Sequence, residues 1–189
     1  GVPSPVHQLA SESPHLSSSG CVVLTPERVS DPSFIEQFRS LKPDVAITAA
    51  YGQILSKEFL AIPKHGTLNI HPSLLPRWRG AAPIQRALQA GDSAVGVTVM
   101  YTVFAMDAGP IIAQERRELD GNEYSEELLS ELFVRGAEMI LRELDAVADG
   151  TAAKIEQDGS LVTHARKMTP EDGRLTFTAN AVVTHNQVR

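Results

Sequence analysis

The sequence predicts an α/β fold: a mostly parallel sheet with helices on both faces. Short apolar runs alternate along the chain with segments of helical spacing, the pattern of a sheet whose strands are joined by helices. The run over residues 45–50 is apolar at nearly every position, as expected of a strand buried on both faces. The length of 189 residues suits one domain, or one domain with a short appendage.

The pattern places strands and helices alternately along the chain. Apolar runs predict strands at residues 21–24, 45–50, 67–70, 95–103 and 111–114. Helical spacing predicts helices at residues 6–12, 32–41, 56–60, 82–90 and 125–149, with a further helix beginning at 179. Residues 1–20 are otherwise a loose leader rich in Ser and Pro, and residues 154–177 are short strand and turn material.

Local signals mark the ends of the helices. Asp31 before Pro32 is typical of an N-cap followed by proline at the first helical position. Gly91 and Gly150 follow two predicted helices, at the place where a left-handed residue commonly ends a helix. The long helix over 125–149 carries a predicted buried stripe at helical spacing: Leu128, Leu129, Leu132, Phe133, Ile140, Leu141, Leu144 and Val147.

The strand over 95–103 has the clearest alternation in the chain. Residues 111–114 are predicted to form its hairpin partner or neighbour, after the turn Asp107-Ala-Gly-Pro. Residues 71–80 contain Pro72, Pro76 and Gly80, so we expect irregular structure there.

The composition is that of an ordinary globular protein, with 42% hydrophobic and 21% charged residues. No apolar run reaches the ~18 residues of a membrane span, so no membrane segment is expected. Cys21 is the only cysteine, which excludes an internal disulfide and a cysteine-built zinc site. Its apolar surroundings predict a core position.

Charge also limits the partners. The net charge is −6, and no broad basic face for nucleic acid is evident. The one local basic cluster is Arg77, Arg79 and Arg86 around Trp78. Such a cluster is ordinarily a solvated surface, with a few phosphate contacts as the alternative.

Two strand ends carry residues suited to chemistry. Asn69 and His71 have the period of a strand, so both point to one face, just where the chain becomes irregular. Asp107 lies in the turn after the 95–103 strand. An amide donates to an oxyanion, an imidazole moves protons near neutral pH, and a carboxylate orients the imidazole. This set suits attack of an external amine on a carbonyl without a covalent enzyme intermediate.

Other chemistries lack their motifs. The chain has no Gly-x-Ser-x-Gly, no phosphate-binding Gly-rich loop and no His spacing for a metal, so we expect no metal site. On spacing alone, Asn69-x-His71 is also compatible with a hydrogen-bonded strand end, and Asp107-Ala-Gly with an ordinary turn. A structural α/β domain is therefore an alternative interpretation of these residues.

The sequence from Asn69-Ile-His-Pro-Ser-Leu-Leu-Pro-Arg-Trp-Arg-Gly-Ala-Ala-Pro-Ile to Leu88 resembles the 10-formyltetrahydrofolate-dependent formyltransferases. Residues 90–92, 96–100 and 106–110, with the motifs Ala-Gly-Asp, Gly-Val-Thr-Val-Met and Met-Asp-Ala-Gly-Pro, extend the resemblance, as do residues 50–55 and 167–172. It covers nearly the whole chain and is weakest over residues 1–24. The segment Arg77–Ile84 favours the branch of the family that acts on methionyl-tRNA.

The resemblance implies particular roles. Asn69, His71 and Asp107 occupy the catalytic positions of the family, in a Rossmann-like catalytic domain. The loop that lines the folate site is matched by Ser73, Leu74, Leu75 and Pro76. The implied reaction transfers a formyl group from the co-substrate 10-formyltetrahydrofolate to initiator methionyl-tRNA, in bacterial cytoplasm or the mitochondrial matrix, and we expect a monomer. A nucleotide-sugar formyltransferase, a formyltetrahydrofolate hydrolase and a folate-binding but inactive truncation are the alternatives.

Three segments are expected along the chain. Residues 1–24 form a leader and first strand, residues 25–178 the catalytic domain, and residues 179–189 the start of a helix or linker. Compared with the family, the opening strand and helix and the C-terminal β-barrel domain are not in this sequence, which begins with Gly1. The expectation is therefore a catalytic core without these ends, processed or a fragment.

Overall fold

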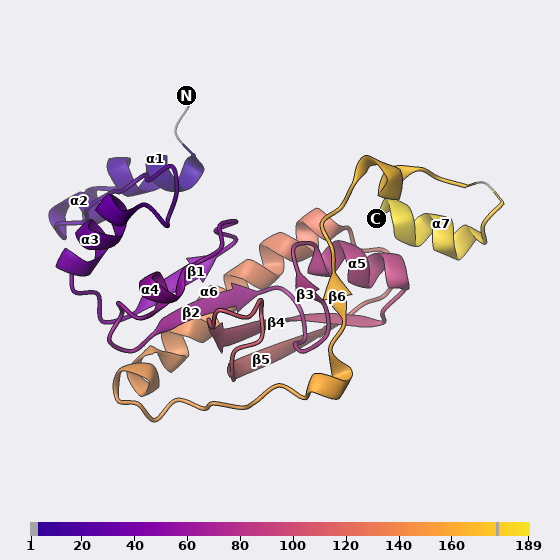
Figure 1. Cartoon of the computed structure of the whole chain (residues 1–189). Coiled ribbons are helices and arrows are strands. Elements are labelled where there is room, and N and C mark those ends of the chain that lie inside the picture. Colours follow the sequence, from indigo (N-terminus) through magenta and orange to yellow (C-terminus); the bar gives the residue numbers. More distant parts are fainter. Residues whose placement is uncertain (1–3, 177) are drawn as a thin grey trace.

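A computed structural model describes residues 4–176 and 178–189 (Figure 1). Its α-helices are α1 (Pro5–Glu12), α2 (Pro14–Ser18), α3 (Pro32–Ser40), α4 (Lys57–Leu60), α5 (Pro83–Ala90), α6 (Ser125–Ala148) and α7 (Ala181–Val188). Its strands are β1 (Ala46–Ala49), β2 (Thr67–His71), β3 (Arg79–Gly80), β4 (Ala94–Tyr101), β5 (Ile111–Glu118) and β6 (His164–Ala165). Two 3₁₀ turns, η1 (Gly159–Leu161) and η2 (Pro170–Gly173), lie near the C-terminus. The predicted α/β class is confirmed.

The main sheet has the strand order β1-β2-β4-β5. Only β1 and β2 are parallel, whereas β4 runs antiparallel to both β2 and β5. The expectation of a mostly parallel sheet was therefore wrong, and the sheet is mixed. An apolar run shows that a strand is covered on both faces, but it carries no information about the direction of its neighbours.

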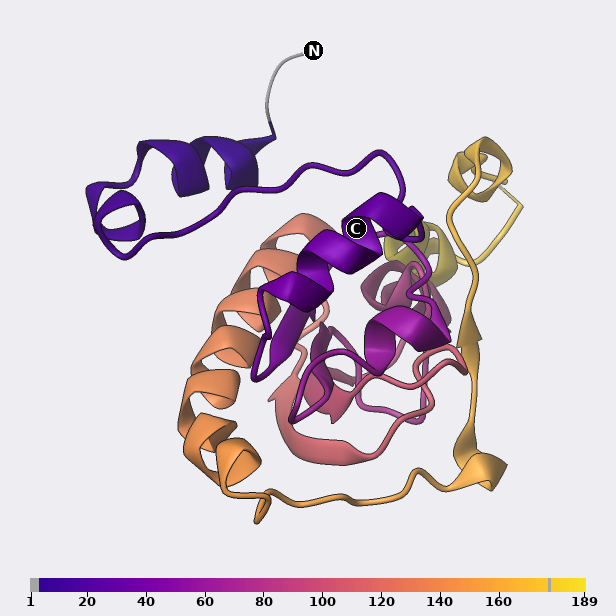
Figure 2. The same ribbon diagram turned by 60° about the vertical axis from the view of Figure 1, so that its left-hand side comes forward.

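One face of the sheet is covered by α6 (Figure 2). Gly136 of α6 lies so close to the sheet that an added Cβ would stand 2.4 Å from Cγ2 of Ile70. The missing side chain therefore lets the helix contact β2 and β4 directly. Helix α5 contributes Ile84 and Leu88 to the same core, on which Val97 of β4 also packs.

The opposite face of β4 is covered by a loop rather than by a large helix. Leu75 packs there against Met100 and Ile111. Beside it, the buried Thr98 hydroxyl donates to the Ser73 carbonyl at 2.6 Å. The expectation of helices on both faces thus does not hold for this central part of the sheet, where residues 72–76 take the place of a helix.

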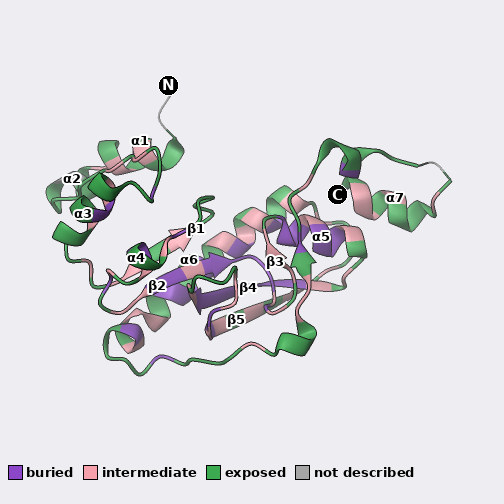
Figure 3. Cartoon of the chain, viewed as in Figure 1, coloured by how far each residue is buried: buried purple, intermediate pink, exposed green. Residues whose placement is uncertain are grey.

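Burial departs from the sequence pattern at the edge strand β1 and on α6 (Figure 3). Ile47 of β1 is 49% exposed, so this strand is not buried on both faces as expected. In α6, Leu141 is exposed, while Met139, which was not predicted, is buried. Helix α6 has its main contacts with β2, β4 and β5.

The N-terminal segment stands apart from the sheet in Figures 1 and 2. The helix predicted at 6–12 is present as α1, which buries no residue. Residues 21–24 are irregular, and both Val22 and Cys21 are exposed, so the predicted first strand and the predicted core position of Cys21 were wrong. No described strand pairs with this run, and a single apolar run without a neighbour gains nothing from strand geometry.

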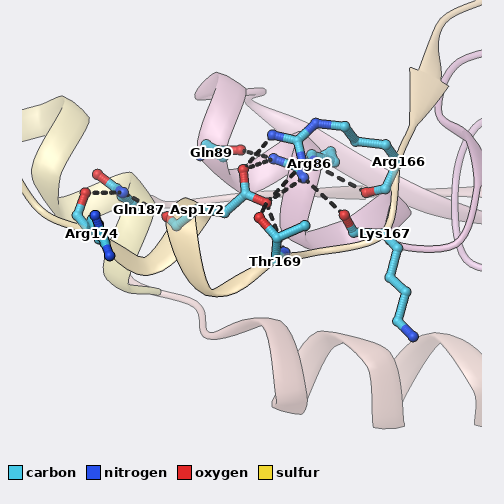
Figure 4. A network of polar contacts seen from close by, with 8 residues as sticks. All are labelled: Arg86, Gln89, Arg166, Lys167, Thr169, Asp172, Arg174 and Gln187. Atoms are coloured by element: carbon cyan, nitrogen blue, oxygen red, sulfur yellow. Dashed lines mark hydrogen bonds and ion pairs between the residues drawn. The ribbon is translucent and has the colours of Figure 1, made fainter.

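The C-terminal segment returns across the sheet end, where β6 pairs with β3 (Figure 1). It is held by an ion-pair network shown in Figure 4. Asp172 accepts hydrogen bonds from Arg86 of α5, from Arg166, and from the backbone and hydroxyl of Thr169. These bonds, with those from Arg86 foremost, hold the pKa of Asp172 far below its usual range.

No helix within residues 4–176 and 178–189 combines the length and the apolar character needed to cross a membrane.

Candidate active site

The predicted pair Asn69 and His71 lies at the C-terminal end of β2, on the face opposite α6. Asn69 Oδ1 accepts a hydrogen bond of 2.8 Å from the hydroxyl of Thr48 in β1. This bond commits the oxygen end of the amide to β1. Within the described part of the chain, no residue accepts a hydrogen bond from that NH₂ group, so it remains a donor for a ligand.

His71 is 5% exposed and makes one close contact, between Nε2 and the Trp78 carbonyl at 3.0 Å. A carbonyl oxygen only accepts, so Nε2 carries a hydrogen. The other nitrogen, Nδ1, faces Asp107 Oδ1 at 3.8 Å. Nδ1 is therefore the ring nitrogen that the Trp78 carbonyl does not occupy.

Asp107 lies in the long turn between β4 and β5. Its Oδ2 accepts a hydrogen bond of 2.8 Å from the backbone N–H of Gly80, and its side chain is 18% exposed. Its other oxygen is the one that faces His71. One oxygen thus holds the carboxylate in place while the other stays available to the imidazole.

Backbone strain gathers at this corner of the molecule. Trp78 and Asp107, which both contact His71, have left-handed φ values of 61° and 48°. Ala50, directly after β1, has a φ of 48° as well. Non-glycine residues in this region cost free energy and are common at functional sites. The strained residues therefore lie in the same part of the molecule as Asn69, His71 and Asp107.

The structure thus brings the predicted trio to one place: Asn69 and His71 on one face of β2, and Asp107 beside His71. Together they provide an amide donor, an imidazole with one committed nitrogen, and a carboxylate. Groups of these three kinds are suited to stabilising a developing oxyanion and to moving a proton.

The loop predicted to bind the co-substrate is largely engaged in packing. Ser73 is buried and donates to the Arg77 carbonyl at 2.7 Å, and Leu75 is buried against β4 and β5. Leu74 and Pro76 are the two members that keep more than a trace of exposed surface. Because Ser73 and Leu75 are buried, their contacts serve to hold the loop in place. The binding role of the loop stays a prediction.

A pocket of about 210 Å³ lies between this loop and α5. Its lining includes Ser73, Leu74, Trp78, Asp92 and Arg116, but neither His71 nor Asp107. The pocket is thus separate from the trio.

The basic cluster noted in the sequence is occupied within the protein. Arg77 pairs with Asp92 at 2.9 Å, Arg79 donates to Gln157, and Arg86 is buried on Asp172. The alternative of free phosphate contacts therefore finds no support in Arg86 or Arg79.

A set of exposed apolar side chains, close in sequence to the end of β1 and to Asp107, was not predicted from the sequence. They come from two segments, after β1 and before Asp107, and are Tyr51, Ile54, Val103, Phe104 and Met106. Lys57 Nζ, at the start of α4, lies 5.1 Å from the centre of the Phe104 ring. Apart from Val103, which lies in the predicted strand 95–103, these are large apolar residues in stretches expected to be loops, and that is the signal that could have indicated them.

No group of three or more His, Cys, Asp or Glu side chains arranged for a metal ion occurs among residues 4–176 and 178–189.

Comparison with known proteins shows the family of the chain. The family model described as "Formyl transferase" matches residues 2–144. The chain is 41% identical over 187 residues to "Methionyl-tRNA formyltransferase" of Phenylobacterium zucineum, covering 99% of this chain and 59% of the relative. It is 41% identical over 186 residues to the protein of the same name from Saccharopolyspora erythraea, covering 98% and 58%. The chain thus spans about three fifths of the length of these curated relatives.

Solved structures show the same fold. A 4-N formyltransferase from Francisella tularensis has a TM-score of 0.75 at 17% identity, covering 96% of this chain and 72% of that one. HypX from Aquifex aeolicus, solved in complex with tetrahydrofolic acid, has a TM-score of 0.71 at 19% identity, covering 97% and 31%. At these identities the likeness establishes the fold, and the match over residues 2–144 establishes the family: this chain belongs to the formyl transferase family.

Proposed function

We propose that this chain is the catalytic part of an enzyme that transfers a formyl group from 10-formyltetrahydrofolate to the α-amine of methionyl-initiator tRNA. The observation that carries the proposal is the meeting of Asn69, His71 and Asp107 at the end of β2. The relatives that share 41% identity carry the name of this activity. The co-substrate is supported by the family and by the tetrahydrofolic acid bound to the structural neighbour HypX.

In the proposed reaction, the amine attacks the formyl carbon, and a new C–N bond forms. Asn69 donates its NH₂ group to the oxyanion that develops on the formyl oxygen. The bond from the formyl carbon to the folate nitrogen then breaks, with the amine giving up a proton and the folate nitrogen taking one. His71 passes this proton at Nδ1, since Nε2–H is engaged by Trp78. Asp107 supports the charged imidazole.

Binding of the co-substrate is proposed at the apolar surface beside the trio. Tyr51, Ile54 and Phe104 offer exposed apolar area to a flat ring system, next to the donors that the reaction requires. Leu74 and Pro76 remain candidates in the loop predicted from the resemblance.

The decisive experiment measures formyl transfer by the full-length protein onto methionyl-tRNA and, in parallel, onto a dTDP-amino sugar and water. Transfer to the tRNA alone supports the proposal, whereas transfer to the sugar or to water would replace it with one of those activities. Binding of folinic acid without turnover on any acceptor would indicate a folate-binding but inactive protein.

The Asn69→Ala variant tests the proposed oxyanion donor. Turnover is expected to fall about a hundredfold or more, with little change in folinic acid binding, because the donor acts mainly on the transition state. Unchanged turnover would remove Asn69 from the mechanism.

We also propose a monomer acting in bacterial cytoplasm or the mitochondrial matrix, where initiator tRNA is formylated. The relatives named above are bacterial. The division into residues 1–24, 25–178 and 179–189 likewise stays a proposal, which limited proteolysis would test.

A further inference from the structure

Gln157 lies in the irregular segment between α6 and β6 and bridges two loops that are far from it in sequence. Its Oε1 accepts hydrogen bonds from Arg79, from Nε at 3.0 Å and from Nη2 at 2.7 Å. Its Nε2 donates to the backbone carbonyls of Asp107, at 2.9 Å, and Gly109, at 2.8 Å. Both lone-pair sites and both hydrogens of the amide are therefore used.

The two loops joined in this way are the ones that hold His71 and Asp107. On one side of Arg79, the Trp78 carbonyl binds Nε2 of His71. On the other side, the Gly80 N–H binds Oδ2 of Asp107. The opposite half of the Gln157 amide binds the main chain of Asp107 itself. The distance between the imidazole and the carboxylate thus depends on how these two loops are joined.

The loops do not keep this geometry by local preference. Trp78 and Asp107 have left-handed φ values, which persist only where surrounding contacts enforce them. Gln157 supplies four hydrogen bonds to these two loops from a third segment, one of them to the main chain of Asp107. Its neighbours Glu156 and Asp158 are exposed, so the inward position is particular to this residue.

We propose that Gln157 is a positioning residue of the active site, which sets the approach of Asp107 to Nδ1 of His71. The expected effect on kcat rests on the proposed function, whereas the expected effect on the surroundings of the His71 ring does not. Gln157 lies beyond residues 2–144, the part of the chain matched by the family model. The segment after α6 would therefore complete a site whose reacting groups all lie within residues 69–107.

The segment that carries Gln157 is held independently on both sides. Ile155 exchanges two backbone hydrogen bonds with Ile111, of 2.8 and 2.9 Å. Further on, the Thr163 carbonyl accepts from the Arg79 N–H at 2.9 Å. Replacing the Gln157 side chain is therefore expected to leave the path of the chain unchanged.

Two variants separate positioning from folding. Gln157→Glu keeps the volume and the contact with Arg79, but it has no hydrogen to donate to the carbonyls of Asp107 and Gly109. Gln157→Met removes both ends of the bridge. Gln187→Met is the matched control, because Gln187 Nε2 also donates to two backbone carbonyls, those of Asp172 and Arg174, away from the trio.

The experiment uses the full-length protein and three readouts: kcat and KM for formyl transfer, folinic acid binding, and the ¹⁵N shifts of the His71 ring. Both Gln157 variants are expected to lower kcat about 10- to 100-fold with KM and folinic acid affinity little changed, because small misplacements of reacting groups act on the transition state. The ¹⁵N shifts of His71 are expected to move in both Gln157 variants and to stay in place in Gln187→Met.

The outcomes are distinguishable. Unchanged His71 shifts and unchanged kcat in Gln157→Glu would overturn the positioning role, as would equal effects in Gln157→Met and Gln187→Met. If the wild-type protein transfers no formyl group but the His71 shifts still move only in the Gln157 variants, the proposed function fails and the positioning role stands. Should Gln157→Met not fold, Gln157→Glu alone decides.

Discussion

Two carboxylates in this protein, Asp107 and Asp172, lie in networks of opposite character. Asp172 is bound by two arginines and by Thr169 through six hydrogen bonds of 2.6 to 3.0 Å, and its side chain is 6% exposed. Asp107 accepts one hydrogen bond, from Gly80, and stands 3.8 Å from His71. Both aspartates have little exposed side-chain surface, yet only Asp172 has all its bonding capacity filled.

The difference separates a structural carboxylate from one suited to chemistry. The donors around Asp172 stabilise only its charged form, so its pKa is held low and it stays ionised at any ordinary pH. The hydrogen bonds also tie α5 to the C-terminal segment (Figure 4). No described donor binds Oδ1 of Asp107, and the imidazole of His71 faces this oxygen. The carboxylate can therefore interact with a proton that the imidazole carries.

Asp107→Asn is expected to give the largest effect of the substitutions compared here. Asparagine keeps an oxygen for the Gly80 N–H but removes the charge opposite His71. Turnover should fall about a hundredfold or more, with the melting temperature nearly unchanged. Steady-state kinetics together with a thermal melt check both parts. A large loss of stability with normal turnover would reverse the roles assigned to the two carboxylates.

Asp172→Asn is expected to show the opposite pattern. The substitution leaves Arg86, whose side chain is 9% exposed, beside an amide instead of a carboxylate, and an unpaired buried cation is costly. The melting temperature should drop by several degrees while kcat stays at the wild-type value below the transition. Retained stability would show that the other oxygens that accept from Arg86, those of Gln89 and of the Arg166 and Lys167 carbonyls, suffice without the charge.

Gly80 contacts both Asp107 and the C-terminal segment that carries Asp172. Gly80→Ala should therefore have an effect on turnover and on stability that is intermediate between those of the two preceding substitutions. Gly80 has a φ of 123°, and an added Cβ would stand 2.6 Å from the Ala165 carbonyl oxygen of β6. Strain of this kind costs about 1–3 kcal/mol of unfolding free energy. Because Gly80 also donates to Asp107, turnover should fall together with stability. Urea unfolding combined with a turnover assay tests this coupling, and loss of only one of the two quantities would argue against it.

The smallest expected effect is the pH dependence of stability. The pKa of Asp172 is lowered in the folded protein, so its contribution to stability is present above its unfolded pKa of about 3.9 and is lost as the pH falls below that value. The difference in unfolding free energy between the wild-type protein and Asp172→Asn should therefore shrink progressively below about pH 5. Urea unfolding of both proteins across this range gives the comparison, and a pH-independent difference between them would count against the low pKa.

Much of the site was predictable because its residues follow local rules. Asn69 and His71 share a face through the period of a strand, and Asp107 follows a turn signal after the clearest strand. The helices with strong end signals, such as α3 after Pro32 and α5 before Gly91, were also predicted closely. Each of these features depends on neighbours a few residues away.

Other features depend on partners far along the chain. The direction of β4, the loop that covers it, and the exposure of Ile47 follow from which elements meet in space. Likewise, Gln157 has no motif around it, and it becomes visible only through hydrogen bonds to residues 48 to 78 positions away. The sequence suggests that Arg86 belongs to a surface cluster, whereas in the structure it is buried against Asp172.

By itself, the sequence determined the α/β class, the order of most elements and the placing of Asn69, His71 and Asp107 at strand ends and turns, because periodicity, caps and turn residues act through the local backbone. The tertiary structure alone decided the mixed direction of the sheet, which nitrogen of His71 is committed to Trp78, and which carboxylate has all its bonds filled. Those properties arise from hydrogen bonds between segments distant in sequence, and no local pattern encodes where such partners come to lie.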